Sequence, residues 1–128
     1  MTAAKQFEDR CCLKAYLSRY FRAKEKQTLL QKRLRRLQTE LPSAEIQNRI
    51  QQQANLERAC MLEIMDVLDL LPPESMERTI LELRHLDCKS WKEIHRSVYL
   101  TRSPCFIYYN KGLDKLLAMP EVRKKLKL

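Results

Sequence analysis

Apolar side chains recur three and four positions apart from about Lys5 to about Leu41. The stripe consists of Leu13, Tyr16, Tyr20, Ala23, Leu30, Leu34, Leu37 and Leu41. This spacing predicts one long helix with an apolar face, in which Gln27 is a polar interruption at a core position. A single helix cannot bury such a face by itself, so the pattern also predicts a partner helix.

A second apolar stripe predicts that partner between about Ala44 and Leu71. Its members are Ile46, Ile50, Cys60, Ile64, Val67 and Leu71. Pro42 ends the first helix, and Ser43 is expected to cap the second. Because the connection is short, an antiparallel hairpin within one chain is the simplest arrangement, and a coiled-coil dimer of two chains is the alternative.

Three shorter helices are expected after the Pro72-Pro73 pair. They span about residues 74–86, 91–99 and 103–118. The second of them begins with a capping box, in which Ser90 and Glu93 each accept a hydrogen bond from the other's backbone amide. Thr101 or Ser103 is expected to cap the third helix. Its expected inward positions are Cys105, Tyr108, Gly112, Leu113 and Leu116.

The 128 residues contain a single glycine, Gly112. Glycine-rich phosphate loops need several glycines at fixed spacing, and sheet-rich folds need them in their turns, so both are excluded. Residues that favour helices dominate the chain, which predicts an all-α fold. We expect a long-helix hairpin or coiled coil over residues 1–71, a helix-turn-helix bundle over 72–119 and a basic tail over 120–128.

Basic side chains outnumber acidic ones by 25 to 16, for a net charge of +9. The excess lies at both ends: residues 1–41 carry +7, residues 42–73 carry −3 and residues 74–128 carry +5. Such a balance favours a polyanionic partner such as nucleic acid. The run Lys32-Arg33-Leu34-Arg35-Arg36 is either the solvated outer face of the first helix or a grip on the DNA backbone or on an acidic protein.

Catalysis has no candidate residues, because no acid–base pair, activated nucleophile or phosphate loop is present, and no cofactor is expected. His85, Cys88 and His95 match no zinc-ligand spacing, so no metal site is expected. The odd number of scattered cysteines indicates free thiols. With no apolar leader in the first nine residues and no long apolar run, we expect a protein of the cytoplasm and not of a membrane.

Two short helices joined by a tight turn, from Ser90 to Leu117, form a helix-turn-helix pattern. In such a pair the first helix braces the second, whose N-terminal side chains enter a major groove of duplex DNA. The N-terminus of the second helix also favours nearby phosphates.

Three stretches of this region resemble region four of bacterial sigma factors. They are Leu71-Pro-Pro-Glu-Ser-Met-Glu-Arg-Thr-Ile-Leu-Glu-Leu-Arg-His-Leu, Ser90-Trp-Lys-Glu-Ile and Leu100-Thr-Arg-Ser, and the resemblance covers about residues 66–118. Together with the basic helical N-terminal part, the chain is similar to small phage or prophage regulators of the ArpU and RinA type. The resemblance implies a prophage transcriptional regulator in the cytoplasm of a bacterial host, associated with the nucleoid, which binds promoter or operator DNA and RNA polymerase.

Candidate DNA contacts lie on the helix at 103–118 and on the residues before it. Arg102 and Asn110 suit guanine and adenine edges, and Lys111 suits a phosphate. The full candidate set is Thr101, Arg102, Ser103, Phe106, Tyr109, Asn110 and Lys111. By resemblance only, the polymerase contacts would be Glu77, Arg78, Glu82 and Arg84.

The chain departs from the family pattern at three single positions and on the exposed face of the helix at 103–118. That face usually carries several Arg or Lys side chains, whereas here Arg102 and Lys111 are the only cations. Cys88 and Tyr99 stand where glycine is usual, and His95 stands where alanine is usual.

The alternative function is an adaptor that binds RNA polymerase or another regulator through Phe106, Ile107 and Tyr109, with a helix-turn-helix that no longer contacts bases.

Overall fold

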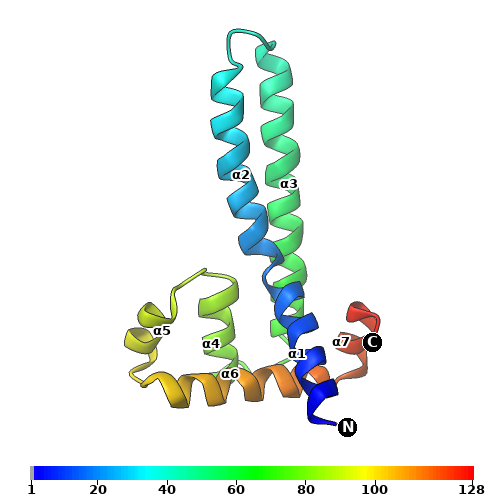
Figure 1. Ribbon diagram of the computed structural model, residues 1–128, viewed down its shortest axis with the longest axis vertical. Coiled ribbons are helices and arrows are strands. Elements are labelled where there is room, and N and C mark those ends of the chain that lie inside the picture. Colours follow the sequence, from blue (N-terminus) through cyan, green and yellow to red (C-terminus); the bar gives the residue numbers. More distant parts are fainter. Residues whose placement is uncertain (1) are drawn as a thin grey trace.

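The structure, a computed structural model, describes residues 2–128, which form seven helices and no strand (Figure 1). The prediction of an all-α fold is confirmed. The helices are α1 (Ala3–Leu17), α2 (Arg19–Arg36), α3 (Ser43–Leu68), α4 (Met76–His85), α5 (Trp91–Val98), α6 (Arg102–Leu117) and α7 (Pro120–Leu126). Over residues 2–128, none of these helices combines the length and the apolar composition needed to cross a membrane.

Helices α2 and α3 form a long antiparallel hairpin that projects away from the other helices (Figure 1). Near the base of this hairpin, Arg19 donates to Glu63 at 2.6 Å, and the amide of Gln53 donates to the carbonyl of Ala23 at 3.0 Å. Helix α2 ends at Arg36, before the expected Leu41, because the following residues form hydrogen-bonded turns. The expected cap is also wrong, since Pro42 is the N-cap and Ser43 is the first helical residue.

The expected continuous helix from Lys5 to Leu41 is wrong at Ser18, where α1 ends and α2 begins. The bend separates the apolar stripe into two parts that pack against different partners. Leu13 and Leu17 of α1 are fully buried in the core with α4 and α6, whereas the stripe of α2 faces α3.

Two polar contacts hold α1 in place across the C-terminal helices. The guanidinium of Arg10 donates two hydrogen bonds to Asp114 of α6, at 2.8 and 2.6 Å. These hydrogen bonds lower the pKa of Asp114. The buried carboxylate of Asp9 lies 3.3 Å from Arg123 of α7. Helix α1 is thus part of the base of the molecule and not of the hairpin.

One hydrophobic core joins α1, the end of α3 and helices α4 to α7. Its fully buried members include Ile64, Leu71, Ile80 and Leu113. The expected boundary between residues 71 and 72 therefore falls inside this core. We call these helices, together with the last turns of α3, the base.

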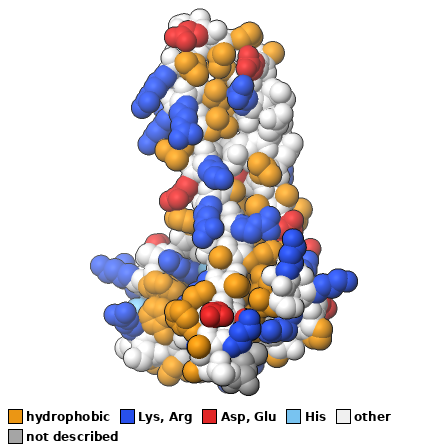
Figure 2. Space-filling view, turned by 45° about the vertical axis from the view of Figure 1, so that its right-hand side comes forward, with side chains coloured by type: hydrophobic (Ala, Val, Ile, Leu, Met, Phe, Trp, Pro, Cys, Tyr) orange, Lys and Arg blue, Asp and Glu red, His pale blue; other side chains and the backbone are white. Residues whose placement is uncertain are grey.

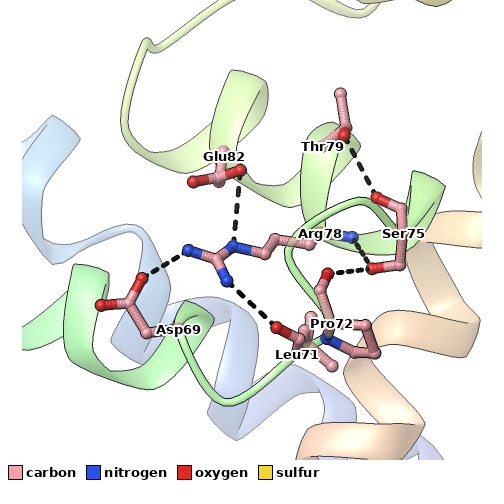
Figure 3. A network of polar contacts seen from close by, with 7 residues as sticks. All are labelled: Asp69, Leu71, Pro72, Ser75, Arg78, Thr79 and Glu82. Atoms are coloured by element: carbon pink, nitrogen blue, oxygen red, sulfur yellow. Dashed lines mark hydrogen bonds and ion pairs between the residues drawn. The ribbon is translucent and has the colours of Figure 1, made fainter.

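Figure 3 shows how the loop after α3 is fixed to α4. Arg78 donates to Asp69 at 2.6 Å and to the carbonyl of Leu71 at 3.1 Å, and it lies 3.7 Å from Glu82. Ser75 caps α4 by accepting a hydrogen bond from the amide of Arg78. The helix expected from Glu74 consequently begins at Met76.

Helix α6 crosses α4 at the only glycine of the chain. A Cβ atom on Gly112 would lie 2.7 Å from Cδ1 of Leu81 and 3.1 Å from Cβ of Glu77. Both distances are shorter than an ordinary van der Waals contact, so a side chain at this position would require Leu81 and Glu77 to shift.

Residues 120–128, expected as a basic tail, are mostly helical and form α7. Val122 is buried in the core, and Arg123 donates to the carbonyl of Leu117 at 3.2 Å. This helix packs at the C-terminal end of α6, about 24 Å of helix away from Arg102 (Figure 1).

Candidate nucleic-acid interface

Helices α5 and α6 are joined by the short turn at residues 99–101. The predicted capping box opens α5: the amide of Glu93 donates to Oγ of Ser90 at 3.2 Å, and the amide of Ser90 donates to Oε1 of Glu93 at 3.1 Å. At the other end of α5, the amide of Leu100 donates to the carbonyl of His95 at 3.2 Å. Local hydrogen bonds therefore set both ends of α5.

The two departures from glycine fall on left-handed backbone. Cys88 has φ of 55° and Tyr99 has φ of 56°. A side chain costs about 1–2 kcal/mol in this conformation, which glycine avoids. The structure thus explains why glycine suits both turns. The side chain of Tyr99 is 93% exposed, so packing of the ring offsets little of this backbone strain.

The first turn of α6 is open to solvent. Thr101, Arg102 and Ser103 are all exposed, and the first turn contains no acidic side chain. The helix begins at Arg102, one residue earlier than expected. Thr101 occupies the N-cap position, but its hydroxyl makes no capping hydrogen bond, so it is available to a ligand.

The remaining candidates on α6 differ in exposure. Phe106 is half-buried and packs on Trp91 of α5, with 4.6 Å between ring centroids. Asn110 is half-buried, and Lys111 is exposed but lies 3.8 Å from Glu77. Ile107, which is 66% exposed, is the large apolar side chain that α6 leaves open.

Tyr109 was expected on the exposed face, and this is wrong, since the residue is only 4% exposed. Its hydroxyl lies 2.8 Å from Nε2 of His85 on α4. Burial raises the pKa of Tyr109 to about 12 and lowers the pKa of His85 to about 4, so both groups are neutral at pH 7. The residue lies four positions after Cys105 and four before Leu113, near the centre of the buried stripe. Tyr108, expected inward, is half-buried.

The four residues assigned to polymerase by resemblance all have partners within the chain. Glu77 is buried and accepts a hydrogen bond from Lys115 at 3.0 Å. A hydrogen bond from its own backbone amide, and then the Lys115 ammonium, lower the pKa of Glu77. Arg78 and Glu82 belong to the network of Figure 3. Arg84 lies over the ring of Trp91 at 5.0 Å and donates to the carbonyl of Lys89.

Two cations on α5 were not predicted as site residues. Lys92 and Arg96 are exposed and lie one helical turn apart. Neither they nor Arg102 form an ion pair within residues 2–128. Their four-residue spacing, which begins inside the capping box at Lys92, puts both on one face of α5 and was the signal available in the sequence. Figure 2 shows, on the face that it displays, Lys and Arg side chains on both the hairpin and the base, with fewer acidic ones between them.

Within residues 2–128, no group of three or more His, Cys, Asp or Glu side chains could hold a metal ion. His85 is hydrogen-bonded to Tyr109. The five cysteines are free thiols.

Comparison with family models, curated proteins and solved structures returns no match for this chain.

Proposed function

We propose that the chain is a transcriptional regulator of phage type, with a helix-turn-helix like that of sigma region four, that binds duplex DNA through α6. The observation that carries the proposal is the exposed leading edge of α6, made by Thr101, Arg102 and Ser103. A helix that offers an arginine and two hydroxyls at its N-terminus has the groups that contact base edges and phosphates in a major groove.

The rest of the base holds this edge in a fixed position. Arg10 binds Asp114, Tyr109 pairs with His85, and Gly112 allows α6 to lie directly on α4. Rigid support matters because base contacts depend on side chains that are already oriented when the DNA arrives.

In this proposal Arg102 contacts guanine, Asn110 contacts adenine, and Ser103 and Lys111 bind phosphates or base edges. Lys92 and Arg96 of α5 neutralise phosphates beside the groove. Residues 87–111 contain five basic and two acidic side chains, which supports this role. The basic residues of α7 lie at the opposite end of α6 and take no part in this contact.

The test is a gel shift with DNA fragments selected from random genomic DNA, in the presence of competitor DNA at physiological salt. We expect a discrete complex whose affinity falls steeply with salt, because cations that bind phosphates release counterions. Absence of any discrete complex under these conditions would contradict the proposal.

The adaptor is the second candidate, and the exposure of Ile107 and Tyr99 favours it. Exposed large apolar side chains often mark protein interfaces. Tyr109 no longer belongs to that surface, because it is buried. A pull-down that retains RNA polymerase, is lost in Ile107→Glu and occurs without any DNA shift would favour the adaptor over the DNA-binding regulator.

A further inference from the structure

A pocket of about 280 Å³ lies between α5 and α6. Helix α5 contributes Trp91, Lys92 and His95, and helix α6 contributes Arg102 and Phe106. All five side chains are aromatic or basic. Such a lining suits a ligand that has both a flat ring and a negative charge.

The aromatic part of the pocket is held in place by its neighbours. The rings of Trp91 and Phe106 are 4.6 Å apart and tilted by 43°. Tyr109 meets Trp91 edge-on at 5.0 Å, and the guanidinium of Arg84 lies 5.0 Å from the Trp91 ring centroid. Four side chains from three helices therefore fix one aromatic surface in advance of binding.

The basic part lies beside that surface. The guanidinium of Arg102 is 5.6 Å from the Phe106 ring centroid, and Lys92 is exposed at the pocket. Because neither cation is paired with a carboxylate within residues 2–128, both can bind an anion without first breaking an ion pair.

His95 provides the third observation. Its Nε2 atom is buried and has no hydrogen-bond partner within the described chain. A buried polar atom without a hydrogen-bond partner carries a free-energy penalty. A ligand group that hydrogen-bonds to it removes this penalty and therefore binds more tightly.

We propose that this pocket binds one unstacked nucleotide of the DNA. The base packs against Trp91 and Phe106, its phosphate lies beside Lys92, and His95 hydrogen-bonds to the base, while Arg102 stays free to contact guanine in the adjoining duplex. The volume lies just below the roughly 300 Å³ at which small-molecule sites begin, which suits one nucleotide rather than a larger cofactor. The inference rests on the proposed function, and it predicts a preference for DNA in which a base is easily unstacked, such as a mismatch or a strand end.

Trp91 is the only tryptophan of the chain, so its fluorescence reports on this pocket directly. The probes are a short oligo(dT), an abasic oligomer of the same length and charge, and the mononucleotide dTMP. We expect oligo(dT) to quench Trp91, dTMP to quench it at higher concentration, and the abasic oligomer to bind without quenching. Equal quenching by the abasic oligomer, or tighter binding of dTMP than of oligo(dT), would overturn the proposal.

Two variants distinguish the contribution of the Phe106 ring to binding from that of the Lys92 charge. Phe106→Leu should weaken oligo(dT) binding by about 5- to 150-fold, as expected for loss of one base–aromatic contact, and leave binding of the abasic oligomer unchanged. Lys92→Ala, on an exposed side chain, should weaken both oligomers alike, and Arg58→Ala on α3 should change neither. If Phe106→Leu fails to fold, His95→Ala takes its place, with selective loss of oligo(dT) binding as the expected result.

The failure of this inference differs from the failure of the proposed function. If duplex DNA shifts in a manner that needs Arg102 while oligo(dT) and a mismatched duplex leave Trp91 unquenched, the pocket proposal is wrong and the regulator stands. If no DNA of any kind binds, both are wrong.

Discussion

The base and the free end of the hairpin are built from the same types of side chain but are packed differently. In the base, large apolar residues such as Leu113 and Ile80 are fully buried, and two helices approach each other at Gly112. Toward the tip of the hairpin, an open groove of about 730 Å³ lies between α2 and α3 beside Leu34. In the hairpin, α2 and α3 each bury only the face that contacts the other helix. The helices of the base each pack against several neighbours.

The two regions also differ in charge. Helix α2 carries eight basic side chains and one acidic side chain, and Arg19 is the only one of these basic residues that forms an ion pair within residues 2–128. In the base, Arg10, Arg78 and Lys115 are paired with Asp114, Asp69 and Glu77. The difference indicates that ion pairs between helices help to hold the geometry of the base, whereas most basic side chains of α2 face solvent.

The largest expected effect compares the two regions through one type of truncation. Leu113→Ala should lower the free energy of unfolding by about 2–5 kcal/mol, because it leaves a cavity in a closely packed core. Leu34→Ala should cost clearly less, because its site already borders an open groove. Denaturant titration measures both values. A cost for Leu34→Ala equal to that for Leu113→Ala would remove the distinction between the regions.

The next effect is the pH dependence of the base. The pKa of His85 is about 4 when folded, below its ordinary value of 6.5, so the unfolded chain binds more protons between these values. Stability is therefore complete above about pH 6.5 and falls as the pH decreases toward 4, by about 3 kcal/mol. Burial is the main cause, with smaller contributions from Arg84 and Lys14.

The measurement is the free energy of unfolding at pH 7 and at pH 4.5 for wild type and His85→Gln. The variant keeps a polar partner for Tyr109 and loses the titration, so its stability should depend less on pH. Since carboxylates titrate in both proteins, the difference between the two curves isolates His85. Parallel curves would contradict the assignment.

The smallest effect concerns the strained turn before α6. Tyr99→Gly should raise the free energy of unfolding by about 0.5–1 kcal/mol, because relief of the left-handed strain exceeds the entropic cost of glycine. The exposed side chain loses little packing on removal. Thermal unfolding measures the change, and a lower melting temperature would show that the tyrosine ring stabilises the turn.

Local patterns predicted much of this fold. The capping box of Ser90 and Glu93 and the inward position of Gly112 depend on neighbouring residues, and both are present. The break at Ser18 was missed, because it depends on α1 packing against α6, a contact between residues 104 positions apart in the case of Arg10 and Asp114. No pattern within the sequence of α1 predicts that it packs against α6.

The candidate site was predicted in part. The exposed edge at residues 101–103 follows from the helix start and the turn, which are local features. Tyr109 was misplaced although its four-residue spacing from Cys105 and Leu113 puts it on the buried face of the helix. Its hydrogen-bond partner, His85 on α4, could not be predicted from the local pattern. Lys92 and Arg96 were overlooked because their place in the candidate interface depends on the position of α5 beside α6.

The most direct test of the central claim is the affinity of Arg102→Ala for a DNA site selected with the wild-type chain. We expect a loss of about 1–3 kcal/mol in binding free energy and a relaxed preference at one base pair. Arg58→Ala, which removes an exposed arginine from α3, serves as the control and should bind as the wild type does. An Arg102→Ala chain with the affinity and footprint of the wild type would contradict the account.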